Sequence, residues 1–213
     1  DMFIGDYFNV SFKNPKKETE TVTLMCRIAK FIEAKESEPA KVIIVPLENI
    51  FGSVFAKWNM TDTLEGGYQA SNIKTEIESM VPTLTTIFGE HLKNMIVFNT
   101  NVVGEGVSGS GSSVDGKSSE HIITSVKIDL MNEQEIFGTR IWGSTMLDNE
   151  TLYGHLPLFR LNPWLIPLQV GGSYWTKSIR DGATVVIVLG RGTCSNTNPS
   201  ATPAHTRVKF AIG

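Results

Sequence analysis

The residues that perform metal and thiol chemistry are few in this chain, and their spacing forms no ligand pattern. The 213 residues contain two cysteines, Cys26 and Cys194, which lie far apart in sequence. Its four histidines are His91, His121, His155 and His205. Zinc sites use closely spaced ligands such as C-x-x-C or H-x-x-x-H, and neither spacing occurs here. The sequence therefore predicts no metal and no cofactor, and it leaves open whether the cysteines are reduced or paired.

The residue patterns of hydrolases and nucleotide-binding proteins are equally weak. No G-x-S-x-G segment places a serine on a strand-to-helix elbow. The Gly-rich segment 103–119 does not follow a strand and open a helix, as a phosphate-binding loop must, so we expect a mobile surface excursion there. Glu133 and Glu135 are better explained as charges at a helix start than as an acid–base pair. We therefore predict that the protein is not an enzyme.

One polar segment has the composition of a binding loop. Cys194–Thr206 is rich in Ser, Thr, Asn and Pro, and it lies between two strongly apolar segments that can hold its ends. We expect partner-binding residues in and beside this loop, and they are Arg180, Asp181, Arg191, Asn196, Asn198 and His205. Asn and Ser supply adaptable hydrogen bonds, and Arg is enriched at interfaces. The alternative is that the loop is a solvated connection.

The aromatic residues allow a second interpretation of where a partner binds. Tyr174 and Trp175 are adjacent in a predicted strand, so their side chains should face opposite sides, with one of them in the core. The other is either structural as well, which we favour, or exposed at the surface. The aromatic residues between Trp142 and Trp164 either cover the core or form an exposed patch at an interface. We keep that stretch as the second choice for a binding surface.

The elements that would position these residues predict an α+β fold. We expect strands at Phe3–Phe12, Thr21–Ile28, Lys41–Leu47, His121–Leu130, Gly172–Ile179, Ala183–Gly190 and Arg207–Ile212. Apolar residues at helical spacing predict two helices, one from Ile73 to Met80 and one from Leu84 to Met95. A capping box at Asn132–Glu135 predicts a short third helix that stops at Gly138. Leu152–Leu168 is expected to be irregular.

The composition is that of a globular protein with no affinity for nucleic acid or membrane interiors. The net charge is −3, hydrophobic residues make up 41% and charged residues 19%. Without a basic stripe, nucleic acid is a poor partner, and no apolar run is long enough to insert into a membrane. A chain of this length can bury a sizeable core without disulfides or metals. We therefore expect one domain spanning residues 1–213.

Several motifs in a fixed order resemble one known family. They are Gly66–Lys74, Val126–Leu130 with the capping segment that follows, Gly171–Ser178, and Arg207–Ile212. In this order they are similar to a bacterial and prophage family, catalogued as a domain of unknown function, with a C-type-lectin-like fold. That fold also includes formylglycine-generating enzymes and phage variable tip proteins. The resemblance covers roughly residues 60–213, and Lys177-Ser178-Ile179 stands where the family has Arg-Ser-Pro.

The resemblance implies a fold with mixed β-sheets, two to three short helices and long irregular loops. It also implies that the first strand, Phe3–Phe12, pairs with the last, Arg207–Ile212. The residues that hold sugar-bridging calcium in lectins are missing, because Glu38-Pro39 is followed by Ala40 rather than Asn. The closely spaced cysteines of formylglycine-generating enzymes are missing too.

The expected function is that of a non-enzymatic phage or prophage virion protein, either structural or receptor-binding. Such a protein would be a tail tip, a fibre or a capsid decoration, located on a virion or an extracellular surface. Its partners would be other virion proteins or a host-surface protein or glycan, and self-association into a homo-oligomer is also considered. The alternatives are a secreted bacterial adhesin of the same fold and a degenerate formylglycine-generating-type enzyme.

Overall fold

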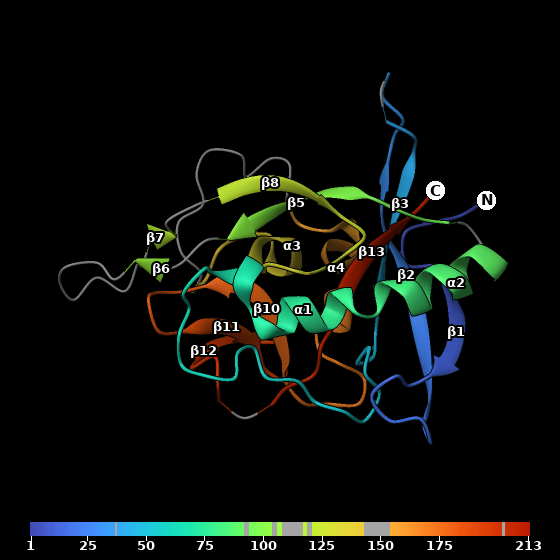
Figure 1. The fold of residues 1–213 in the computed structure, drawn as a ribbon. Helices are drawn as coiled ribbons and strands as arrows, with labels where there is room; N and C mark the ends of the chain where they lie inside the picture. Colours follow the sequence, from blue (N-terminus) through green and yellow to red (C-terminus); the bar gives the residue numbers. More distant parts are fainter. Residues whose placement is uncertain are drawn as a thin grey trace.

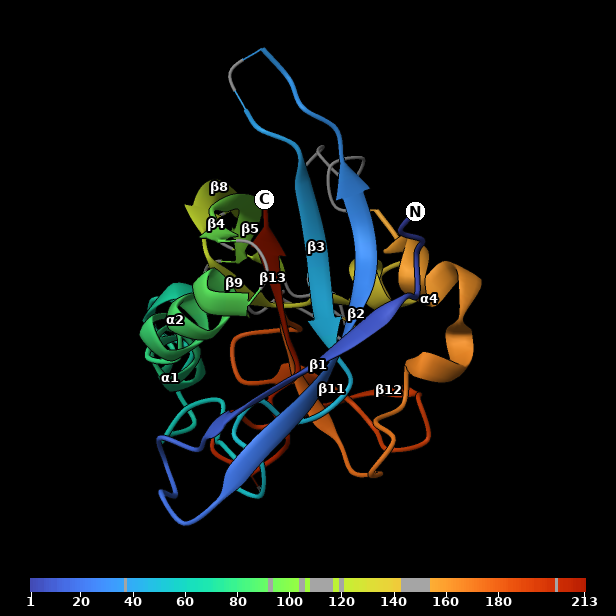
Figure 2. The ribbon, with the colours of Figure 1, turned by 90° about the vertical axis from the view of Figure 1, so that its right-hand side faces the viewer.

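The computed structural model describes residues 1–36, 38–91, 94–103, 106–107, 117–118, 121–142, 154–201 and 203–213. Its largest sheet has six strands, and every pairing in it is antiparallel (Figures 1 and 2). The six strands are β1 (Tyr7–Lys13), β2 (Thr21–Ile32), β3 (Lys41–Pro46), β13 (Val208–Ile212), β4 (Met95–Ile96) and β9 (Ile128–Leu130). The order is β1-β2-β3-β13, and β9 and β4 share the far side of β13. The last strand of the chain is therefore central.

Both faces of this sheet are covered, which places two apolar clusters on opposite sides of it. Ile44 and Phe210 belong to one cluster, and their neighbours Ile43 and Ala211 belong to the other, as strand alternation requires. Helices α1 (Asn72–Glu78) and α2 (Val81–His91) supply the first cluster. Helices α3 (Glu133–Phe137) and α4 (Pro157–Leu161) supply the second. Figure 2 shows α1 and α2 on one side of the strands and α4 on the other.

The helix starts follow local sequence rules. The Ser71 side chain accepts a hydrogen bond from the backbone N–H of Lys74, and this begins α1. Asn132 and Glu135 form the expected reciprocal capping box of α3, which ends at Gly138 with a positive φ of 78°. Two helices and the capping box are thus confirmed. The second helix ends at His91, and Met95 lies in β4, because β13 offers this segment a strand partner.

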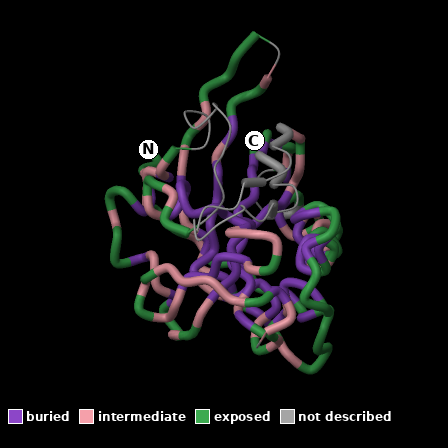
Figure 3. The backbone as a smooth tube through the Cα atoms, turned by 90° about the vertical axis from the view of Figure 1, so that its left-hand side faces the viewer, coloured by how far each residue is buried: buried purple, intermediate pink, exposed green. Residues whose placement is uncertain are grey.

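A second, three-stranded antiparallel sheet contains β10 (Tyr174–Ile179), β11 (Val185–Val188) and β12 (Cys194–Thr197). Two short ribbons complete the strands, β5 (Phe98–Val103) with β8 (His121–Val126) and β6 (Gly106–Val107) with β7 (Lys117–Ser118). The turns η1 (Tyr68–Ala70) and η3 (Pro163–Leu165) are 3-10 helices. Figure 3 shows the tip of the β2–β3 hairpin exposed and the centre of the molecule buried. The fold is mixed α+β with mostly antiparallel sheets.

The expected pairing of the first and last strands is wrong. β1 pairs with β2 in a hairpin, from Tyr7 opposite Arg27 to Lys13 opposite Thr21. A short connection costs little loop-closure entropy, so this local partner is favoured. β1 lies at the edge of the strand order, and its alternate exposed residues show that one of its faces meets solvent, whereas all five residues of the central strand β13 are buried.

Two other expectations need correction. Cys194–Thr206 is not a loop throughout, because its first four residues form β12 against β11. The segment expected to be irregular contains α4, which begins with Pro157 in the favourable first-turn position, and η3. Tyr174 and Trp175 face opposite sides as expected, and both are structural, because each face of β10 meets one of the two buried clusters. Residues 104–105, 108–116, 119–120 and 143–153 lie outside the described residues.

Candidate functional site

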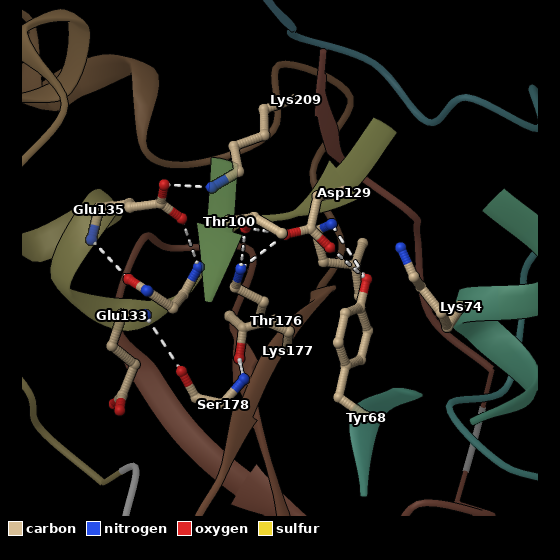
Figure 4. A network of polar contacts seen from close by, with 12 residues as sticks. Tyr68, Lys74, Thr100, Asp129, Glu133, Glu135, Thr176, Lys177, Ser178 and Lys209 are labelled. Atoms are coloured by element: carbon tan, nitrogen blue, oxygen red, sulfur yellow. Dashed lines mark hydrogen bonds and ion pairs between the residues drawn. The ribbon is translucent and has the colours of Figure 1, made fainter. Parts of the chain in front are cut away.

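Several charged side chains are buried in the described part of the chain. The buried charged residues are Lys41, Lys74, Asp129, Glu133, Glu135, Lys177, Arg207 and Lys209. Most of them gather where β9, β10 and β13 approach each other (Figure 4). A buried charge is tolerated only when it is paired and hydrogen-bonded, so the partners of each group decide whether the cluster is structural or reactive.

Asp129 is the centre of this cluster and is fully buried. The ammonium group of Lys177 lies 2.6 Å from one of its carboxylate oxygens, and the hydroxyl of Thr100 donates to the same oxygen. The hydroxyl of Tyr68 donates to the other oxygen at 2.8 Å. Both oxygens therefore have donors, and the carboxylate ties η1, β5, β9 and β10 together.

Electrostatics keep this carboxylate ionised. Burial by itself raises the pKa of Asp129, but the nearby ammonium groups of Lys177, Lys209 and Lys74 outweigh it, and the pKa is lowered. Burial and the Asp129 charge raise the pKa of Tyr68 well above its ordinary value, so its hydroxyl keeps its proton. Asp129 and Lys177 thus form a fixed ion pair, with the neutral hydroxyls of Tyr68 and Thr100 as further donors. Forming this pair requires no proton transfer.

A second buried pair extends the network to the capping box of α3. Lys209 of β13 donates to the carboxylate of Glu135, whose other oxygen accepts from the backbone N–H of Asn132. Burial lowers the pKa of Lys209, and the Glu135 charge acts in the opposite direction. The same ammonium lies 5.5 Å from the centre of the Phe98 ring. These contacts fix α3 against the central strand.

The thiols do not have the environment of catalytic cysteines. Both are free, so no disulfide joins Cys26 to Cys194. Cys194 donates to the Glu133 carboxylate at 3.1 Å, and burial together with this negative charge raises the pKa of its thiol. Burial also raises the pKa of Cys26. A reactive cysteine needs a lowered pKa, so neither thiol is activated for nucleophilic attack.

A pocket of about 450 Å³ opens beside the second sheet. Its walls come from β11, β12, the residues just before β10, the loop that precedes β13 and the segment that contains Phe55. The lining residues are Phe55, Gly172, Ser173, Ile187, Leu189, Ser195, Asn196, Thr197, Ala201, Pro203, Ala204 and His205. Apolar and hydroxyl- or amide-bearing side chains alternate around it, which suits a ligand with both an apolar face and polar groups.

His205 and Phe55 form one wall of this pocket. Their rings meet edge to face with centroids 4.6 Å apart, and 51% of the Phe55 surface is exposed. Burial lowers the pKa of His205, so the imidazole is neutral at pH 7. Its Nδ1 atom is buried and has no hydrogen-bond partner among the described residues. Gly172 has a φ of 84°, and a Cβ there would lie 2.5 Å from Nε2 of His205, so only glycine fits.

The structure brings three of the six predicted binding residues together. Asn196 and His205 line the pocket, and Arg180 donates to the Asn196 side chain at 2.8 Å. Arg180 also lies 4.9 Å from the centre of the Trp142 ring, so the second-choice aromatic stretch begins beside the same site. Tyr153 of that stretch lies outside the described residues. Trp164 is 68% exposed, away from the pocket lining.

The other three predicted residues do not line the pocket. Asp181 accepts from two backbone N–H groups at 2.8 Å and shapes the β10–β11 turn. Arg191 donates to the side chain of Thr193 at 3.1 Å in an exposed turn. Asn198 is exposed beyond the end of β12. Their roles are therefore local, although Arg191 and Asn198 remain accessible.

Sequence reasoning missed Phe55 and the buried ion pairs. No local signal links Phe55 to a loop near the C-terminus, and the lysines of β10 and β13 occupy positions where apolar residues are expected. The spacing of Gly111–Ser118 also matches a phosphate-binding loop. However, Lys117–Ser118 form β7 and the next described element is strand β8, whereas a phosphate loop leads into a helix.

No family model, curated protein or solved structure matches this chain. Within the described residues, no three His, Cys, Asp or Glu side chains are grouped as a metal site would require. None of the described helices has the length and apolarity to cross a membrane. The function must therefore be argued from the pocket and its surroundings.

Proposed function

We propose that this protein is a non-enzymatic recognition module with a C-type-lectin-like fold, carried by a phage or prophage virion as a tail tip, fibre or capsid decoration. The observation that carries the proposal is the pocket beside β12, with the exposed ring of Phe55 and the side chain of His205 on its wall. It lies beside Cys194–Thr206, the polar segment in which the composition predicts partner-binding residues.

The fold part of the proposal rests on the order of the motifs. Gly66 and Gly67 have positive φ angles and lead into the Ser71 cap, as a helix-start motif requires. The aromatic strand motif is β10, and the last motif is the central strand β13. The pairing of the first strand with β2 is the feature that differs from the expected arrangement.

The chemistry of the described residues favours binding over catalysis. Both Asp129 oxygens and both Glu135 oxygens receive hydrogen bonds from buried donors, so neither carboxylate is available to a substrate. The Cys194 thiol has a raised pKa. These groups stabilise the fold, and the pocket offers mainly hydrogen bonds and an aromatic face.

The pocket suits a saccharide or a polar peptide segment. A sugar ring has an apolar face that can pack on Phe55 and hydroxyl groups that can bond to Asn196 and to the neutral His205. Of the two, we favour a host-surface glycan, because the wall combines one exposed aromatic ring with several small polar side chains.

The test is binding of the purified chain to an array of bacterial surface saccharides, followed by two matched variants. Phe55→Ala should abolish binding, whereas Phe31→Ala should leave it unchanged, because Phe31 is 41% exposed but lies on the β2–β3 hairpin away from the pocket. Equal binding by both variants would place the site elsewhere. Gold-labelled antibody on native particles tests the virion assignment, and label confined to a bacterial envelope would favour the adhesin.

A further inference from the structure

The outer edge of the six-stranded sheet is open on β1. In the described strands, β1 bonds only to β2, and its register from Tyr7 to Lys13 is continuous, without a bulge. Its sequence contains neither proline nor glycine. Such a strand presents a row of backbone donors and acceptors to any strand that reaches it.

Alternation identifies which residues face outward. The carbonyl of Asp6 accepts from Ile28, and the N–H of Asn14 donates to Glu20, so the even-numbered residues bond toward β2. In an antiparallel ladder the residues between them point their N–H and C=O groups the other way. The outward backbone groups therefore belong to Tyr7, Asn9, Ser11 and Lys13.

This edge lacks the usual protection against pairing. Natural edge strands carry lysines in mid-strand, prolines, inward charges or bulges that discourage a second strand. Here the only charged residue of β1 is Lys13, at its last position. The exposed side chains of Asn9 and Ser11, in the middle of the strand, are small and uncharged.

We propose that two copies of this chain pair through β1, antiparallel and about a two-fold axis at Val10, to form one continuous sheet. In this register Asn9 lies opposite Ser11 of the second copy, and Tyr7 lies opposite Lys13 of the second copy. Each of these pairs joins two outward-facing residues, so each exchanges two backbone hydrogen bonds. A register shifted by one residue would oppose outward groups to inward ones and form none.

The charges on β1 favour a second copy over an unrelated strand. The two-fold axis places each Lys13 opposite Tyr7 of the second copy rather than opposite the second Lys13, and the Tyr7 ring keeps its own cation, the Arg27 guanidinium 5.0 Å from its centre. Asp6 and Lys13 lie at opposite ends of the strand, so antiparallel pairing brings opposite charges to each end of the interface. β1 is thus complementary to itself.

Sedimentation of the full chain over a range of concentrations tests the proposal. The native chain should form dimers, and Ser11→Pro should weaken the dimer by at least about tenfold, because it removes an outward N–H. The backbone hydrogen bonds of β1 to β2 are kept, and only the hydrogen bond between the Ser11 and Thr23 hydroxyls is lost on that side. Ser11→Thr keeps the N–H and is the matched control. Circular dichroism checks that each variant is folded.

Two double variants test the register even if Ser11→Pro fails to fold. Asn9→Lys with Ser11→Lys opposes positive charges across the axis and should give monomers. Asn9→Asp with Ser11→Lys opposes unlike charges at the same positions and should restore the dimer. A native chain that stays monomeric up to millimolar concentration, or double variants that dimerise equally, would overturn the proposal.

Discussion

Replacing Lys177 with Met should destabilise the protein severely, because it leaves the Asp129 carboxylate buried without its closest cation. The two groups are 2.6 Å apart, and both side chains are completely inaccessible to solvent. Tyr68 and Thr100 would still donate to the carboxylate, but neither carries a charge. Met is close to Lys in length and fills the space of its methylene groups, so the variant removes mainly the charge.

The expected loss follows from the cost of an unpaired buried ion. Removing one partner of a buried ion pair costs about 3–5 kcal/mol. Lys177 also donates to the Thr100 hydroxyl at 2.6 Å, and that contact is lost as well. We therefore expect the upper part of this range for the free energy of unfolding at pH 7. Since most domains are stable by only about 5–15 kcal/mol, the variant should be folded but weak.

The direction of the Asp129 pKa shift predicts how the stability loss of Lys177→Met changes with pH. In the native protein the pKa of Asp129 is lowered, so the ion pair stabilises the fold above the unfolded-state pKa and this contribution is lost as the pH falls through the folded pKa. Without Lys177 the largest favourable charge is gone, and burial should raise the pKa of Asp129 above its unfolded value. The variant should then gain stability on mild acidification, so its deficit shrinks from pH 7 toward pH 4.

Urea unfolding followed by tryptophan fluorescence measures both quantities, because Trp58 and Trp175 are buried beside the network. Lys17→Met is the control, since the Lys17–Glu20 pair is 3.9 Å long and exposed and should contribute little. A loss below about 1 kcal/mol for Lys177→Met at pH 7, or a loss that does not change with pH, would refute the reasoning.

Two further predictions concern other buried groups. Arg207 donates to the backbone carbonyls of Pro46, Leu165 and Ile166, so Arg207→Met should cost at least about 2 kcal/mol in urea unfolding. Arg207→Lys should be nearly as harmful, because one ammonium cannot reach the carbonyl of Pro46 and those of Leu165 and Ile166 at the same time. Native stability in the Arg207→Lys variant would contradict this. Cys194 should react with iodoacetamide at pH 8 more slowly than a thiol of ordinary pKa, because burial and the Glu133 charge raise its pKa. Glu133→Gln should accelerate this reaction. Equal rates measured by mass spectrometry would show that the carboxylate does not control the thiol.

Local features of the fold were predictable because their causes are local. The Ser71 cap and the Asn132–Glu135 capping box each involve backbone groups within one helical turn, so their residue types reveal them. Strand alternation likewise predicted that Tyr174 and Trp175 face opposite sides. Alternation alone did not decide whether one of them is exposed, and both are buried because both faces of β10 are covered.

Long-range pairing was not predictable from the same patterns. Alternating apolar residues predict a strand in Phe3–Phe12, and the observed strand is Tyr7–Lys13, but the alternation does not identify its partner. β2 is selected because a short turn joins it to β1, while β13, whose five residues are all buried, lies at the centre of the sheet. For the same reason, only part of the candidate site was predicted from the sequence. Asn196 and His205 lie in a recognisable polar segment, but Phe55 joins them only through folding.

The sequence alone therefore determined the α+β class, the helix caps and the polar segment beside the last strand, because each depends on residue types within a few positions. Only the tertiary structure decided which charges are buried. Lys177, Lys209 and Asp129 sit in strands that look like ordinary mixed sequence, and burial becomes favourable only when β9, β10 and β13 bring opposite charges within bonding distance. An ion's desolvation cost is offset by partners far away in the chain, so no local pattern can reveal it.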